Sequence, residues 1–168
     1  MLKAQRRSGQ LKETARRLCA ALMAQARTPA FFTRFGVPDT IDGRFDLVAL
    51  HAWLMLEPLG RDPALAQALV NEIFAQFDEA LRDLGIGDIG MNRRLKTMAS
   101  AFYGRLQAYR NASTREDLAQ ALWRNLYRGA LDRQPEADAL ATYATRSRSH
   151  LANLDSAGGV EFAPLPTT

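Results

Sequence analysis

The sequence lacks most of the features that catalysis or membrane insertion would need. Its 168 residues include one cysteine, Cys19, which excludes an internal disulfide and a cysteine-based metal cluster. The most apolar stretch, residues 47–56, is far too short to cross a bilayer. P-loop, nucleophile-elbow and Cys/His patterns are missing, as is a secretory signal. We therefore expect a non-enzymatic protein that is not integral to a membrane, without catalytic residues, metal or cofactor.

Charge is divided unevenly along the chain. Residues 1–34 hold eight cations against one acid, a net charge of +7, whereas the other 134 residues hold 14 cations and 17 acids, a net charge of −3. The eight cations are Lys3, Arg6, Arg7, Lys12, Arg16, Arg17, Arg27 and Arg34. Such a front end favours RNA or an anionic membrane surface as a partner. The alternative is an ordinary solvated helix face.

Apolar residues recur at helical spacing, and no stretch alternates with the period of a strand. The pattern predicts an all-α protein, a single compact bundle of about six to seven helices. The helix over 45–56 is apolar all round and should be the buried centre. Other helices are expected over 10–27, 64–84, about 91–110, from 114 and over 135–153. We divide the chain into a basic N-terminal helix and connector packed on the core (1–35), a helical core (36–155) and a flexible tail (156–168).

Residues 85–90 form a glycine-rich bend that contains a literal G-x-G-x-x-G pattern. In nucleotide-binding folds this pattern joins a strand to a helix, but here an amphipathic helix precedes it. A helix-ending glycine turn is therefore the better interpretation. Farther along, Gly104 within a helix predicts a close crossing by another backbone. His51, in the apolar helix, is expected to be a core histidine rather than a metal ligand.

Three cations, Arg93, Arg94 and Lys96, follow the bend at the start of a predicted helix, where the helix dipole disfavours positive charge. A negative charge close to these three cations would compensate this unfavourable interaction with the helix dipole. Asp83 and Asp88 are the internal candidates, and an acidic or phosphate-bearing partner is the functional alternative.

Three segments, taken in order, resemble a known family. They are GRFDLVALH (43–51), DEALRDLGIGD (78–88) and AFYGR (101–105), within a resemblance that spans about 37–109. This combination is similar to the ubiquinol-cytochrome c chaperone family, in its alphaproteobacterial form. The resemblance implies a chaperone without nucleotide hydrolysis that binds newly synthesised cytochrome b for haem insertion and assembly of the cytochrome bc1 complex, respiratory complex III.

The resemblance also implies partners and a location. Cytochrome b is the expected client, with a small partner protein, and the ribosome or an anionic membrane surface is a further candidate through residues 1–34; DNA is not expected. The expected location is the cytoplasm, with peripheral attachment to the inner membrane as an option, on the matrix side for a mitochondrial member.

A helical groove with a polar rim is the expected client site. Its candidate partner-binding residues are Asp78, Arg82, Asp88, Arg93, Lys96, Phe102, Tyr103 and Arg105. The rival hypothesis is a basic helical adaptor that binds RNA or the ribosome through the front end.

Overall fold

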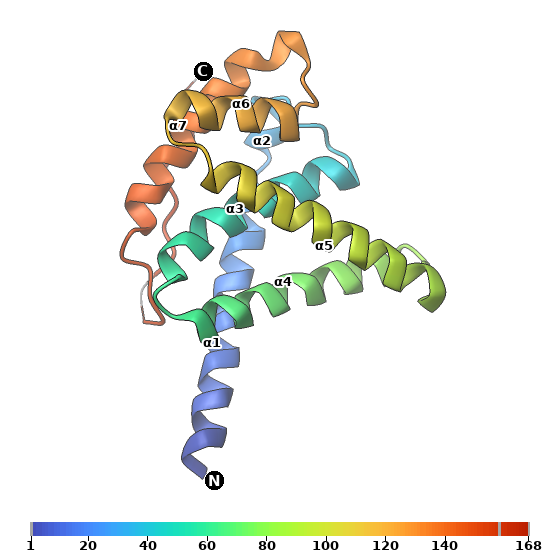
Figure 1. Ribbon diagram of the computed structural model, residues 1–168, viewed down its shortest axis with the longest axis vertical. Helices are drawn as coiled ribbons and strands as arrows, with labels where there is room; N and C mark the ends of the chain where they lie inside the picture. Colours follow the sequence, from blue (N-terminus) through green and yellow to red (C-terminus); the bar gives the residue numbers. More distant parts are fainter. Residues whose placement is uncertain (1, 158, 168) are drawn as a thin grey trace.

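A computed structural model describes residues 2–157 and 159–167, with side chains from Arg6 onward. Lys3, one of the eight N-terminal cations, lies outside the described side chains, and residues 158 and 168 of the predicted tail lie outside the described residues. Within the described ranges the fold is all-helical, as predicted, without a strand (Figure 1). Its elements are α1 (Leu2–Ala26), α2 (Ala30–Thr33), α3 (Ile41–Leu59), α4 (Pro63–Asp83), α5 (Asp88–Arg110), α6 (Arg115–Leu126), η1 (Leu131–Arg133) and α7 (Gln134–Leu151).

Helix α3 is the centre of the bundle and contacts α1, α4, α5, α6 and α7. Every residue from Phe45 to Met55 is buried, which confirms the interpretation of this segment as a central helix. Its start is fixed by Thr40, whose hydroxyl accepts a hydrogen bond of 3.1 Å from the Gly43 amide. A Cβ at Gly43 would lie 1.9 Å from the carbonyl oxygen of Pro38, so this capping turn requires glycine.

Helix α1 begins at Leu2, well before the predicted start near Gln10. Its second half buries Ala15, Leu18 and Leu22 against the bundle, mainly on α4 and α3. Its first turns extend away from the other helices (Figure 1), and residues 6–10 are exposed. Cys19 lies on the packed half, where burial raises the pKa of its thiol to about 11.

Helices α4 and α5 form a hairpin around the glycine-rich bend. Gly85 adopts φ of 76°, its amide donates to the Arg82 carbonyl, and the Ile86 amide donates to the Leu81 carbonyl. This Schellman-type ending confirms a helix-terminating glycine turn. The nucleotide-binding alternative would need a strand before the bend, and the described residues there form α4. Helix α5 already starts at Asp88, so the bend is shorter than predicted. The prediction for Gly104 is wrong, because a Cβ there would meet nothing within 4 Å.

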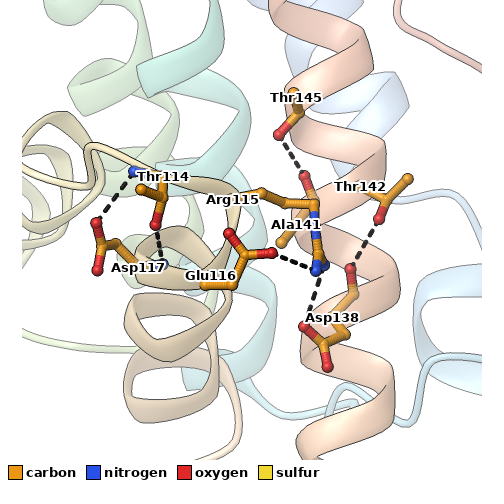
Figure 2. A network of polar contacts seen from close by, with 8 residues as sticks. All are labelled: Thr114, Arg115, Glu116, Asp117, Asp138, Ala141, Thr142 and Thr145. Carbon is orange, nitrogen blue, oxygen red and sulfur yellow. Dashed lines mark hydrogen bonds and ion pairs between the residues drawn. The ribbon is translucent and has the colours of Figure 1, made fainter.

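Helices α6 and α7 pack side by side at one end of the bundle. Of the two residues that could cap α6, Ser113 and Thr114, it is Thr114 that forms a capping box with Asp117 (Figure 2). Arg115 then reaches both Glu116 and Asp138, so one guanidinium group ties the start of α6 to α7.

The segment after α7 returns to the bundle. The Phe162 ring meets the His51 ring edge-on at a centroid distance of 5.2 Å. The Ala163 amide donates a 3.1 Å hydrogen bond to the buried Ser147 hydroxyl, and Arg34 donates to the Pro166 carbonyl. Part of the segment that was expected to be a tail therefore covers the core.

Candidate functional site

An apolar groove opens where α1 and α4 end and α3 begins, beside the first half of α5. Its volume is about 220 Å³, and its apolar lining consists of Met23, Ala26, Ile41, Phe45, Val48, Phe77, Ala80, Leu81, Leu84 and Met98. Ile41 and Leu84 are more than half exposed, at 54% and 57%, so the lining continues onto the molecular surface. The remaining lining residues are Gln76 and two cations, Arg27 and Arg44. The groove can accept an apolar segment and a negative charge beside it.

The two cations differ in their surroundings. Arg44 donates a 2.7 Å hydrogen bond to Asp39, which raises the pKa of the arginine and lowers the pKa of the acid. Its guanidinium carbon also lies 5.7 Å from the centre of the Phe32 ring. Arg27 is exposed and forms no salt bridge within the described part of the chain. A partner's acidic group would therefore meet Arg27 without breaking an existing ion pair.

Three of the predicted partner-binding residues form a charged cluster on the hairpin. Arg82 lies between Asp78, at 2.8 Å, and Asp88, at 3.5 Å, and all three side chains are accessible to solvent. The hydrogen bond to Asp78 is the main cause of a raised pKa of Arg82. This cluster lies on the same helices as Leu81 and Met98 of the groove, so it can serve as a polar edge.

Helix α5 exposes three more of the predicted residues. Arg93, Lys96 and Tyr103 are exposed, whereas Met91 on the same helix is buried. The Tyr103 ring stacks on Phe74 with an interplanar angle of 20°. Among the described residues no salt bridge joins Arg93, Arg94 or Lys96 to an acid, so neither Asp83 nor Asp88 pairs directly with them.

Phe102 differs from its neighbour because it is fully buried. Its ring packs edge-on against Phe74 at a centroid distance of 5.4 Å and contributes to the aromatic layer between α4 and α5. A partner on the surface would meet Tyr103, and Phe102 would support that surface from beneath.

Arg105 is also held inside the protein. Its Nε donates to Asp46, its Nη1 donates to the Ala101 carbonyl, and its guanidinium carbon lies 5.1 Å from the centre of the Phe45 ring. Asp46 is fully buried, and its second oxygen lies 2.8 Å from Nη1 of Arg128. Burial raises the pKa of Asp46, and the two guanidinium groups oppose that rise. Two of the three family-like segments, 43–51 and 101–105, thus meet in one ion pair.

His51 is a core histidine, as predicted. Its Nδ1 lies 2.7 Å from the Leu47 carbonyl oxygen and its Nε2 lies 2.8 Å from the Tyr143 hydroxyl. Because a carbonyl can only accept, Nδ1 carries the proton and Tyr143 donates to Nε2. Gln25 then donates to the Tyr143 oxygen at 3.0 Å. No group of three or more potential metal-binding side chains occurs within the described residues.

Sequence reasoning missed Ile41, Leu84, Asp46 and Arg128. A signal existed for Asp46, because an acid in a helix that is apolar all round needs a cation as partner. A groove was expected, but its lining had no signal in the sequence, since it depends on how α1, α3, α4 and α5 pack together. None of the described helices is both long and apolar enough to span a bilayer.

Comparison with known proteins agrees with the resemblance in the sequence. A family model described as "Ubiquinol-cytochrome C chaperone" matches residues 33–159. The crystal structure of the Cbp3 homolog from Brucella abortus is similar with a TM-score of 0.83 and 35% identity, covering 98% of this chain and 97% of that one.

Two curated relatives carry the name ubiquinol-cytochrome c reductase complex assembly factor 1. The Xenopus laevis protein is 24% identical over 92% of this chain and 83% of its own length. The Drosophila melanogaster protein is 26% identical. The match covers 86% of this chain and 60% of the length of the fly protein. These names denote chaperones and assembly factors rather than enzymes, in agreement with the prediction of a non-enzymatic protein. The chain belongs to the ubiquinol-cytochrome c chaperone family.

Proposed function

We propose that the protein is an assembly chaperone for ubiquinol-cytochrome c reductase, the bc1 complex, and that it holds newly synthesised cytochrome b in the apolar groove. Family membership supports the role in assembly. The single observation that supports the groove as the client site is its lining, ten apolar side chains that reach the surface at Ile41 and Leu84. A segment destined for a membrane would lose its exposure to water there.

The polar edge completes the proposed site. Asp78, Arg82 and Asp88 would contact polar groups that flank the client segment, while Arg27 would meet an acid. We propose that this binding takes place in the cytoplasm, at or near the inner membrane into which cytochrome b is inserted.

Ile41 offers the sharpest test because it lines the groove, is half exposed and occupies the first position of α3. An acid in the first turn suits the helix dipole, so the Ile41→Glu variant should fold normally. It should capture about tenfold less cytochrome b in a pull-down, because the carboxylate would lose water when the client binds. Leu131→Glu is the matched control, since Leu131 is 79% exposed on η1 and does not line the groove. Equal capture by folded Ile41→Glu would refute the groove as the client site.

A second candidate is an adaptor for RNA or the ribosome. The projecting first half of α1, with exposed Arg6, Arg7 and Lys12, favours it. Deleting the gene separates the two functions: selective loss of cytochrome b would support the chaperone, and a general defect in translation would support the adaptor.

A further inference from the structure

The outer end of the α4–α5 hairpin exposes two large aliphatic side chains. Ile89 is 94% exposed and Leu84 is 57% exposed, one on each side of the glycine turn. Figure 1 shows this end of the hairpin, in green, extending away from the other helices. Water surrounds Ile89 almost completely, although burial of an isoleucine is favourable. An exposed aliphatic pair on a projecting end indicates a contact outside the chain.

Cations stand directly beside these aliphatic residues. Arg93, Arg94 and Lys96 are exposed and form no salt bridge within the described residues, even though the start of a helix disfavours positive charge. Asp83 and Asp88 are the nearby acids, and the charge of Asp88 is shared with Arg82. From residue 89 to residue 110 helix α5 contains no acid at all. Over residues 78–96 four acids, Asp78, Glu79, Asp83 and Asp88, equal the four cations in number. The positive charge is instead concentrated on α5 beyond Asp88, where Arg93, Arg94 and Lys96 have no acid on their own helix.

We propose that the hairpin end, defined by Leu84, Ile89, Arg93, Arg94 and Lys96, binds the surface of an anionic lipid bilayer. The two aliphatic side chains would enter the boundary between headgroups and acyl chains. The three cations would lie among the phosphates, since basic residues near an anionic leaflet gain affinity from its surface potential. This inference does not depend on the identity of the client.

A bilayer suits both parts of the surface better than the other anionic partners do. RNA would pair with the cations but would leave the aliphatic side chains in water. A stable protein interface buries about 800 Å² on each partner, with an apolar core, whereas this end offers two separated aliphatic residues on a projecting turn. Leu84 also lines the apolar groove, so docking would bring the mouth of the groove to the level of the headgroups.

Co-sedimentation of the full chain with vesicles tests the proposal. Wild type should bind vesicles of phosphatidylglycerol and phosphatidylcholine more tightly than vesicles of phosphatidylcholine alone. Ile89→Ser should weaken binding to the anionic vesicles about tenfold, because the aliphatic contact is lost. Each of Arg93→Gln and Lys96→Gln should weaken it about fivefold. Leu131→Ser, exposed on η1, and the double variant Arg6→Gln/Arg7→Gln on α1 should bind like wild type.

Several results would overturn the proposal. They are an absence of binding by wild type, equal binding to both kinds of vesicle, and a loss of binding in the α1 double variant but not in Ile89→Ser. A single-stranded RNA oligonucleotide that binds wild type, and whose binding depends on Arg93 but not on Ile89, would identify a nucleic acid as the partner instead. Because Ile89 does not line the groove, capture of cytochrome b by Ile89→Ser should stay at the wild-type level, which separates this surface from the client site.

Discussion

Asp46 is a fully buried acid on α3, and two arginines from distant parts of the chain hold it there. The sequence analysis placed Arg105 among the partner-binding residues, because it belongs to the family-like segment 101–105. The structure leaves only 17% of its side chain accessible. The ion pair joins α3 to α5, so we interpret Arg105 as a residue that maintains the fold beneath the candidate site.

Arg105→Met should therefore act on stability. The methionine can still cover Phe45, but Asp46 would keep only Arg128. Removing one partner of a buried ion pair costs about 3–5 kcal/mol. Urea unfolding measures the loss. Arg110→Met on the same helix is the control, since Arg110 is exposed and should change stability by less than about 0.5 kcal/mol. Similar losses in the two variants would show that the ion pair contributes little.

His51 makes stability depend on pH. Burial lowers its pKa from 6.5 to about 4 in the folded protein. Between these two values the unfolded chain binds a proton that the folded protein does not, so stability falls as the pH falls from 6.5 towards 4. The total loss approaches roughly 3 kcal/mol below pH 4.

Urea unfolding of wild type at pH 7 and pH 5 should show about 2 kcal/mol of this loss. The His51→Gln variant should lose less over the same range, because its side chain does not titrate. His150→Gln provides the control for the loss of a histidine outside the core, since His150 is exposed at the end of α7. Identical pH dependence in wild type and His51→Gln would contradict the assignment.

At the scale of elements, hydrophobic periodicity identified most helices but placed the starts of α1, α3 and α5 several residues too late. Helix α1 extends to Leu2 because a helix that projects into water needs no apolar stripe along that half. Helix α5 includes Gly90, which the sequence assigned to the bend, because Gly87 already provides the extended residue before the helix. The hairpin itself was predictable from its glycine turn, whereas the groove on its side depends on how four helices meet.

Gly43 and Gly104 both lie within helices but in different surroundings, so replacing each with alanine should change stability in opposite directions. Gly104→Ala should stabilise the protein by about 0.5–1 kcal/mol, because the added methyl group meets nothing and alanine favours a helix. Gly43→Ala should destabilise it by more than about 2 kcal/mol, because its Cβ would overlap the Pro38 carbonyl and displace the Thr40 cap. Thermal unfolding of both variants measures the difference. If Gly104→Ala destabilised the protein instead, that result would support the prediction that another backbone crosses close to Gly104.

At the scale of the whole molecule, the all-helical bundle and the family were predictable from the sequence, because the apolar stripes and the three motif segments are local patterns. The division into residues 1–35, 36–155 and 156–168 remains a prediction. Glycine, proline and threonine suggested a free tail, since they carry no helical pattern. The contacts of Phe162 and Ala163 with His51 and Ser147 depend on a surface that only the assembled bundle offers.

Cys19 can report when helix α1 separates from the rest of the bundle. Its thiol is buried on α1, its pKa is about 11, and it is the sole cysteine of the sequence. Alkylating reagents attack the thiolate, so the folded protein should resist them near neutral pH until α1 separates from α4. The rate of alkylation of Cys19 would then report how often the basic helix α1 separates from the bundle.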